Sequence, residues 1–163
     1  MITWEDITHL FAAGKRIDAM KLICQGDDIL KLIPQRDPIV MVDAFYGIEN
    51  SVSYSGLTIR EDNIFVEDGL LSELGVIEHI AQSAAAREGY ERTINGAQPS
   101  LGYIGSINNL KVIGTARVNE TLFTSLKPLY ELGGITLIHA STNVGERVIL
   151  ECEMKIFLKK DQK

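Results

Sequence analysis

One alanine-rich stretch in the middle of the chain limits most strongly what this sequence can fold into. Residues 70–86 have the sequence LLSELGVIEHIAQSAAA, and apolar side chains recur there at the i, i+3, i+4 spacing of a helix that buries one face. That face consists of Leu74, Ile77, Ile80, Ala81, Ala84 and Ala85. Because half of these side chains are alanines, the face is thin, and a sheet can wrap closely around the helix.

Polar and glycine residues mark both ends of the predicted helix. Ser72 is a typical N-cap, because a serine hydroxyl accepts a hydrogen bond from a free backbone N–H of the first turn. Gly89 and the pair Asn95-Gly96 are typical of helix ends, and we expect the helix to terminate there.

The segments on both sides of this helix have the patterns of β-strands. Residues 39–46 form a run rich in β-branched and aromatic residues, and residues 52–59 alternate for part of their length. Four further strands are expected at residues 101–113, 121–130, 135–142 and 147–158. The turns at Asn119-Glu120, Gly133-Gly134 and 143–146 predict that these four form a meander. Two strands, one long helix and a meander predict an α+β fold rather than a βαβ nucleotide-binding fold.

Size and charge exclude several classes of protein. With 163 residues the chain is expected to form one domain, 1–163, with residues 1–27 as an N-terminal helical extension. The net charge of -6 argues against a nucleic-acid partner, because phosphate binding needs clustered Lys and Arg. No apolar run approaches the roughly 20 residues that cross a bilayer, so we expect no membrane span.

The two cysteines indicate a reducing compartment. Cys24 and Cys152 lie far apart in the sequence and belong to no CxxC or Cys/His motif, so we interpret them as buried thiols. The first residues show no basic segment followed by an apolar run, which is the pattern of a secretion signal. We therefore expect a cytoplasmic protein.

Glu78 is the polar residue that says most about function. It lies at the margin of the apolar helix face, where a carboxylate must be solvated, paired or used. One interpretation is a peripheral carboxylate paired with an Arg or Lys of the sheet. The other is an acid/base group in a crevice, since buried carboxylates ionise with difficulty and suit proton transfer.

The histidines give weaker signals. His79 lies about 100° around the helix from Glu78 and off the apolar face, so we expect it to be exposed. His139 is expected on a sheet surface or as a hydrogen-bonded core residue, and His9 on the surface. The three are dispersed and have no metal-ligand spacing, so no metal is expected.

Three motifs resemble, in this order and spacing, the β-hydroxyacyl-acyl-carrier-protein dehydratase family. Residues 28–43, DILKLIPQRDPIVMVD, are similar to its LPHRxPxLLVD segment, and residues 76–82, VIEHIAQ, to its LxExMAQ helix motif. Residues 102–111, GYIGSINNLK, resemble the strand that follows the helix. The likeness covers residues 28–158, and it is closest to the dehydratase-like subfamily of aryl-polyene and related pigment pathways.

The resemblance implies a hotdog fold, in which an antiparallel sheet wraps around one long central helix. It also implies two subunits with an active-site tunnel at their interface, where a helix Glu or Asp meets a His of the other subunit. Together they remove water from a 3-hydroxyacyl thioester and give a trans-2-enoyl product. Glu78 matches the acid position, and no cofactor is implied.

The family's histidine is missing from its expected place. The segment that should carry it corresponds to residues 63–73, where Ile64 occupies the position, or Asn63 after a one-residue shift. We expect Asn63 to act with Glu78, because an amide can orient a hydroxyl although it cannot shuttle a proton near neutral pH. The alternative for Asn63 is a turn residue that caps local N–H groups. Gln35 stands in place of a second family histidine.

The resemblance also suggests substrate contacts and partners. Gln82, Gly75, Gly102 and Gly105 are expected at the substrate, although packing explains the two strand glycines equally well. The expected ligand is an acyl-carrier-protein or coenzyme A thioester. The expected assembly is a homodimer, a higher oligomer, or a heterodimer with a related dehydratase.

Two other functions stay open beside dehydration. Without the histidine, the chain fits a non-catalytic acyl-binding protein or the partner of a full dehydratase. Hotdog proteins also include thioesterases in which a helix carboxylate activates water, so hydrolysis of an acyl thioester is the third candidate.

Overall fold

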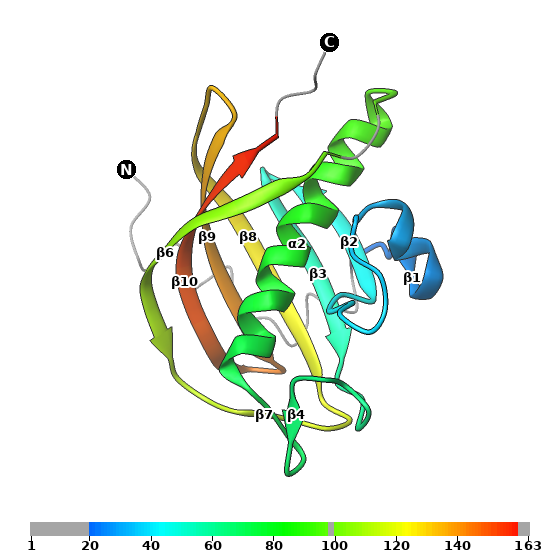
Figure 1. Ribbon diagram of the computed structural model, residues 1–163, viewed down its shortest axis with the longest axis vertical. Coiled ribbons are helices and arrows are strands. Elements are labelled where there is room, and N and C mark those ends of the chain that lie inside the picture. The colour runs from blue at the N-terminus through cyan, green and yellow to red at the C-terminus, as the bar shows by residue number, and fades with distance from the viewer. Residues whose placement is uncertain (1–19, 98–99, 160–163) are drawn as a thin grey trace.

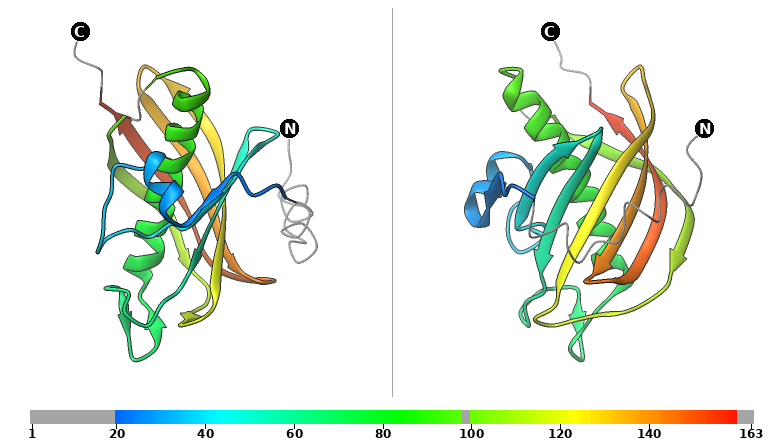
Figure 2. Two further views of the ribbon diagram at one scale, coloured as in Figure 1. Left: turned by 90° about the vertical axis from the view of Figure 1, so that its right-hand side faces the viewer. Right: turned by 180° about the vertical axis from the view of Figure 1, so that it is seen from behind.

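A computed structural model describes residues 20–97 and 100–159 and shows one curved sheet wrapped around one helix (Figure 1). The sheet has seven strands in the order β1-β2-β3-β8-β9-β10-β6, and all neighbouring strands are antiparallel. The strands are β1 Cys24–Gln25, β2 Ala44–Glu49, β3 Val52–Thr58, β8 Thr121–Leu132, β9 Ile135–Val144, β10 Arg147–Leu158 and β6 Gly102–Val112. The helix α2, Glu73–Ile94, crosses one face of this sheet, as the two further views show (Figure 2).

Two small elements complete the described fold. A 3-10 helix, η3, spans Gly26–Lys31 and lies beside β2. A three-stranded sheet is formed by β4 Val66–Glu67, β5 Leu70–Leu71 and β7 Ala116–Arg117, near the N-terminus of α2. No helix in the described part of the chain is long and apolar enough to cross a membrane.

The predicted meander is right for three strands and wrong for the fourth. Strands β8, β9 and β10 follow one another, but β6 pairs with β10 at the sheet edge and not with β8. Both sides of β8 are already taken, by β3 and β9, so no edge is free for β6 there. The Asn119-Glu120 turn leads from β7 into β8, and turn chemistry alone does not reveal which edge a distant strand will join.

The ends of α2 follow the prediction at Ser72 and Asn95 but not at Gly89. The Ser72 hydroxyl accepts a hydrogen bond from the Gly75 N–H at 3.3 Å, which confirms it as the N-cap, and Asn95 is the C-cap. The helix continues through Gly89. The glycine at this position lets the Leu32 carbonyl approach the helix, where any side chain would collide with it. Here glycine serves a close contact rather than a helix end.

The buried face of α2 is rotated from the predicted one. Leu74, expected on that face, is 68% exposed, whereas His79, Gln82 and Ser83 are fully buried. The prediction counted only apolar side chains as buried. Polar side chains can share a buried face when their hydrogen bonds are satisfied, as they are at His79 and Gln82.

Apolar packing between helix and sheet holds the site in place. Val76 and Ile80 of α2 belong to a core cluster with Leu122, Leu126 and Ile138 of the sheet. A second cluster joins η3 to the helix and to β2 and includes Ile29, Ile33, Val42, Phe45 and Ala86. It anchors the loop between η3 and β2 against α2.

The predicted N-terminal extension and the cysteines have mixed outcomes. Residues 1–19 lie outside the described residues, and so does His9. Within the described part of the expected extension, Cys24–Gln25 form β1, paired with β2, instead of a helix. Cys24 and Cys152 are both free thiols, the first half-buried and the second buried, and burial raises the pKa of Cys152 to about 11.

Candidate active site

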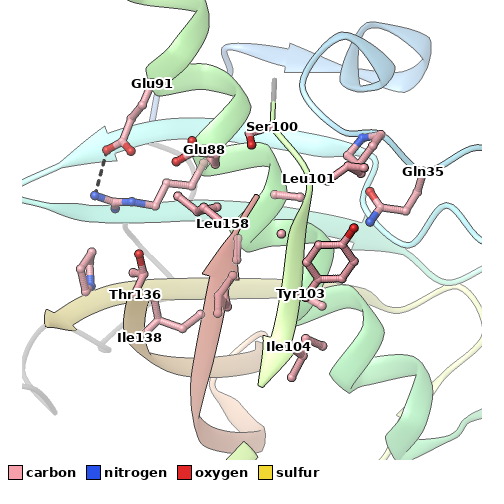
Figure 3. A pocket seen from close by; sticks show the side chains of 18 of the residues that line it. Gln35, Glu88, Glu91, Ser100, Leu101, Tyr103, Ile104, Thr136, Ile138 and Leu158 are labelled. Carbon is pink, nitrogen blue, oxygen red and sulfur yellow. Dashed lines mark hydrogen bonds and ion pairs between the residues drawn. The ribbon is translucent and has the colours of Figure 1, made fainter. Parts of the chain in front are cut away.

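A cavity of about 290 Å³ runs along α2, and we call it the helix cavity (Figure 3). Its helix wall extends from Glu78 to Glu91, a distance of roughly 20 Å at the rise of an α-helix. Small side chains, Ala81, Ala84 and Ala85, leave the space open on the helix side. Side chains of β6, β8, β9 and β10 and of the loop before β2 close the other sides. The thin alanine face predicted from the sequence therefore lines a cavity as well as the core.

Glu78 is a half-buried carboxylate in the lining of the helix cavity. Its Oε1 accepts a hydrogen bond of 2.6 Å from Gln82 Nε2. Among residues 20–97 and 100–159, no Lys or Arg forms an ion pair with it. The interpretation as a peripheral carboxylate paired with a cation therefore finds no support in the described residues.

Gln82 holds Glu78 and the segment before β2 at the same time. Its Nε2 donates to the Ile39 carbonyl at 2.7 Å as well as to Glu78, and its Oε1 accepts from the Met41 N–H at 2.6 Å. The side chain is fully buried and does not belong to the cavity lining. Its position allows it to orient the carboxylate rather than to contact a ligand.

His79 was predicted to be exposed, and this was wrong, because the side chain is 0% exposed. Its Nδ1 lies 2.6 Å from the Met41 carbonyl, and its Nε2 lies 2.9 Å from the Thr124 hydroxyl. Burial lowers the pKa of His79 to about 4, so the imidazole is neutral near pH 7. A carbonyl only accepts, so Nδ1 carries the proton, and the Thr124 hydroxyl must donate to Nε2.

Met41 lies between Asn63 and Gln82, the hydrogen-bond partner of Glu78. Its backbone is held by Gln82 and His79, and its Sδ accepts a hydrogen bond of 3.0 Å from Asn63 Nδ2. The Asn63 Oδ1 accepts from the Phe65 N–H at 2.9 Å, as expected of a turn residue. Asn63 does not line the helix cavity, so a single chain does not bring it together with Glu78.

The three glycines predicted at the substrate lie in different surroundings. Gly102 lines the helix cavity. Gly105 lies against the Phe157 ring, where a side chain would collide with it, and Gly75 packs against Phe65 and Leu71 at the start of α2. Packing therefore accounts for Gly75 and Gly105 in this structure, and their contact with a substrate stays a prediction.

Charged residues gather at the end of the helix cavity that lies farther along α2. Glu91 forms an ion pair with Arg87 at 3.1 Å. Glu88 also lines the cavity and pairs with Arg92 at 2.6 Å. Burial raises the pKa of Glu91, Arg87 opposes this effect, and the nearby Glu131 and Glu88 carboxylates add to it. This charged end of the cavity is not predictable from the sequence, because its residues have the pattern of an ordinary solvated helix surface.

The edge strand β6 exposes large apolar side chains beside the cavity. The exposed side chains on and next to β6 are Leu101, Tyr103, Ile104, Leu110, Val112 and Ile113. Within the described residues, β6 pairs with β10 on one side only. A long apolar edge strand is a ready template for pairing with another chain.

Solved structures show that this architecture is the hotdog fold. The dehydratase heterocomplex ApeI:P from Xenorhabdus doucetiae matches with a TM-score of 0.75 at 15% identity, over 82% of this chain and 91% of that one. Cj0977, a sigma28-regulated virulence protein from Campylobacter jejuni, matches with a TM-score of 0.62 at 12% identity, over 82% and 97%. A hypothetical thioesterase protein with coenzyme A from Streptococcus pneumoniae TIGR4 has a TM-score of 0.55 at 7% identity, over 73% and 87%. At these identities the likeness extends to the fold alone.

The family assignment comes from sequence rather than from structural likeness. No curated protein is significantly similar to the chain. The model of the ApeP-like family, described as ApeP dehydratase, matches residues 27–163, which include all three motifs that resemble dehydratases. The chain therefore belongs to the ApeP-like dehydratase family.

Proposed function

We propose that the protein binds a 3-hydroxyacyl thioester in the helix cavity and eliminates water from it to give the trans-2-enoyl thioester. The observation that carries this proposal is the setting of Glu78. Its carboxylate lines a largely apolar cavity, one oxygen is held by a neutral amide, and no described cation pairs with it. A positioned carboxylate of this kind is suited to proton transfer.

Glu78 can serve both proton transfers of the elimination. As a base it takes the proton from C2, and as an acid it then delivers that proton to the hydroxyl leaving C3. The C3–O bond breaks, water departs, and the electron pair of the C2–H bond becomes the new double bond. No net proton is gained or lost.

The thioester oxygen gains negative charge during this reaction. The N-terminus of α2 lies one turn before Glu78, and backbone N–H groups at helix N-termini stabilise such charge. This position makes the first turn of α2 the proposed site for the thioester carbonyl, which would share the Gly75 N–H with the Ser72 hydroxyl.

Asn63 is proposed to orient the hydroxyl from a second subunit. Its remaining hydrogen-bonding capacity is limited, because Oδ1 already accepts from Phe65 and Nδ2 already donates to Met41. An amide has two N–H groups, so one stays available to a ligand. The proposed contact therefore uses the second N–H of Asn63.

The identity of the product tests this proposal. A 3-hydroxyacyl group on a carrier protein or on pantetheine is incubated with the protein, and the products are followed by mass spectrometry. We expect an enoyl thioester that is lighter than the substrate by one water, about 18 mass units. We expect its formation to be lost in Glu78→Gln. Unchanged activity of that variant would remove the role of Glu78. Free acid instead of enoyl thioester would indicate hydrolysis, the thioesterase function.

A second candidate function is that of a non-catalytic partner of a full dehydratase. Two observations favour it: Asn63 stands near the place of the family histidine, and β6 presents an unpaired apolar edge. The solved ApeI:P structure is itself a dehydratase heterocomplex. Co-expression with a dehydratase encoded in the same operon, followed by size-exclusion chromatography, tests this function. A protein that elutes only as a self-paired dimer would count against it.

A further inference from the structure

Gln35 is a polar residue of the helix cavity that the proposed reaction does not use. It lies on the loop between η3 and β2 and lines the same cavity as Glu78. Figure 3 shows its side chain with the amide end turned toward the side of the cavity that carries Tyr103. The loop thus brings a second neutral hydrogen-bonding group to the cavity from outside the helix.

The side-chain oxygen of Gln35 is buried without a hydrogen-bond partner. Buried polar atoms in folded proteins nearly always have one, so each exception needs a physical reason. Other described side chains with such an atom include Ser53, Ser55, Ser83 and Asn143. Of this whole group, only Gln35 belongs to the lining of the helix cavity. The Gln35 side chain therefore borders a space that a ligand can fill, and its buried oxygen has no partner within the described residues.

Hydrogen bonds hold the backbone around Gln35, and this backbone places the side chain at the cavity. Arg36 Nη1 donates to the Gln35 carbonyl at 2.7 Å and to the Ile33 carbonyl at 2.8 Å. On the other side of the loop, Gln82 Nε2 donates to the Ile39 carbonyl. Gln82 also holds Glu78, so a single side chain sets the positions of both the loop and the carboxylate.

We infer that Gln35 Oε1 accepts a hydrogen bond from an O–H or N–H group of the bound thioester, and that Gln35 thereby selects ligands that carry such a donor. This inference rests on the proposed function. Two groups of that ligand can supply the donor: the hydroxyl of the acyl chain and an amide N–H of the pantetheine arm. Either group could donate to the same acceptor, the Gln35 oxygen that has no partner within the described residues.

The test compares the dissociation constants of two probes, 3-hydroxyacyl-pantetheine and the saturated acyl-pantetheine of equal length. They are measured by calorimetry in the Glu78→Gln background, which prevents turnover. Gln35→Met, which keeps the shape and removes the amide, is expected to weaken the 3-hydroxyacyl probe about 3- to 10-fold, the worth of one hydrogen bond. If the donor is the hydroxyl, the saturated probe is unaffected, and if it is a pantetheine amide, both probes weaken equally.

Two controls keep the outcome interpretable. Gln25→Met changes the same kind of side chain at an exposed position outside the cavity, and it should leave both constants unchanged. Gln35→Glu retains an acceptor, and it should preserve the preference for the hydroxylated probe if the hydroxyl is the donor.

The possible outcomes separate this inference from the proposed function. Equal affinity of Gln35→Met and the parent for both probes overturns the role of Gln35 and leaves the dehydratase proposal standing. A second outcome is that the Glu78→Gln parent binds the probes through Gln35, while the wild-type protein forms no enoyl product. This outcome overturns dehydration and supports Gln35 as a ligand contact. A parent that binds neither probe overturns both.

Discussion

At Met41, three side chains of the candidate site meet one residue. Gln82 holds its N–H, His79 its carbonyl, and Asn63 its sulfur. Gln82 also donates a hydrogen bond to Glu78, so the carboxylate is positioned by a hydrogen-bond network rather than by a cation.

Replacing Gln82 should cost stability as well as activity. Gln82→Met leaves the buried Met41 N–H and the part-buried Ile39 carbonyl without their partners. We expect the free energy of unfolding to fall by about 1–3 kcal/mol, measured by urea denaturation. Gln35→Met is the matched control, because Gln35 Oε1 has no hydrogen bond to lose. Equal stability of the two variants would show that the Gln82 network is not formed.

His79 should make the protein sensitive to acid. Its pKa in the folded protein is about 4, below that of a free imidazole, so the unfolded chain binds the proton more tightly. Its contribution to stability is therefore complete above pH 6.5 and is lost as the pH falls toward 4. The loss is on the order of 3 kcal/mol at pH 4. His79→Gln should flatten this part of a plot of unfolding free energy against pH, and an unchanged slope would contradict the assignment.

Sequence predicted some of these residues and not others. Glu78 was predictable because a carboxylate on an apolar helix face is conspicuous and its motif resembles a family acid. His79 was not, because its burial depends on Thr124 and Met41, which are distant in the sequence. Gln35 appeared only as a substitution in a motif, since no sequence pattern shows that an acceptor is left without a partner.

At the scale of elements, α2 contributes side chains both to the packed core and to the lining of the helix cavity. Val76 and Ile80 pack into the core, while Ala81, Ala84 and Ala85 face the cavity. The helix was predictable from its periodicity and its cap. Its rotation was not, because a single helix does not reveal which polar side chains the sheet will satisfy.

Gly89 provides a test of how closely α2 and the loop pack. Alanine favours a helix over glycine by up to about 1 kcal/mol, so Gly89→Ala would stabilise a free helix. In this fold the new methyl group collides with the Leu32 carbonyl, so we expect a lower free energy of unfolding. Chemical denaturation shows which effect is larger, the helix propensity of alanine or the collision with Leu32. A more stable variant would show that Leu32 does not approach the helix.

At the scale of the whole molecule, the sheet ends in β6, whose outer edge is unpaired within the described residues. The hotdog fold was predictable because the three motifs resemble those of a known family in order and spacing. They lie on η3 and the loop after it, on α2 and on β6. The place of β6 was not predictable from its local turns, since a strand joins the edge that the rest of the sheet leaves open.

The exposed edge of β6 predicts how the protein assembles. We expect Leu110→Arg combined with Ile113→Arg to convert a dimer or heterodimer into monomers, because charges replace apolar contacts along the edge. Light scattering measures the change in mass. Leu132→Arg is the matched control, since Leu132 is even more exposed but lies on β8, away from this edge. Loss of assembly in the control and not in the double variant would place the interface elsewhere.

The single-turnover rate of enoyl formation tests the central claim most directly. It is measured for the wild type, for Glu78→Gln and for Glu146→Gln, a matched change of an exposed glutamate outside the cavity, in the turn between β9 and β10. We predict a loss of at least about 10²-fold in Glu78→Gln, the usual cost of removing a general acid or base, and no loss in Glu146→Gln. Enoyl formation at the wild-type rate in Glu78→Gln would contradict the account.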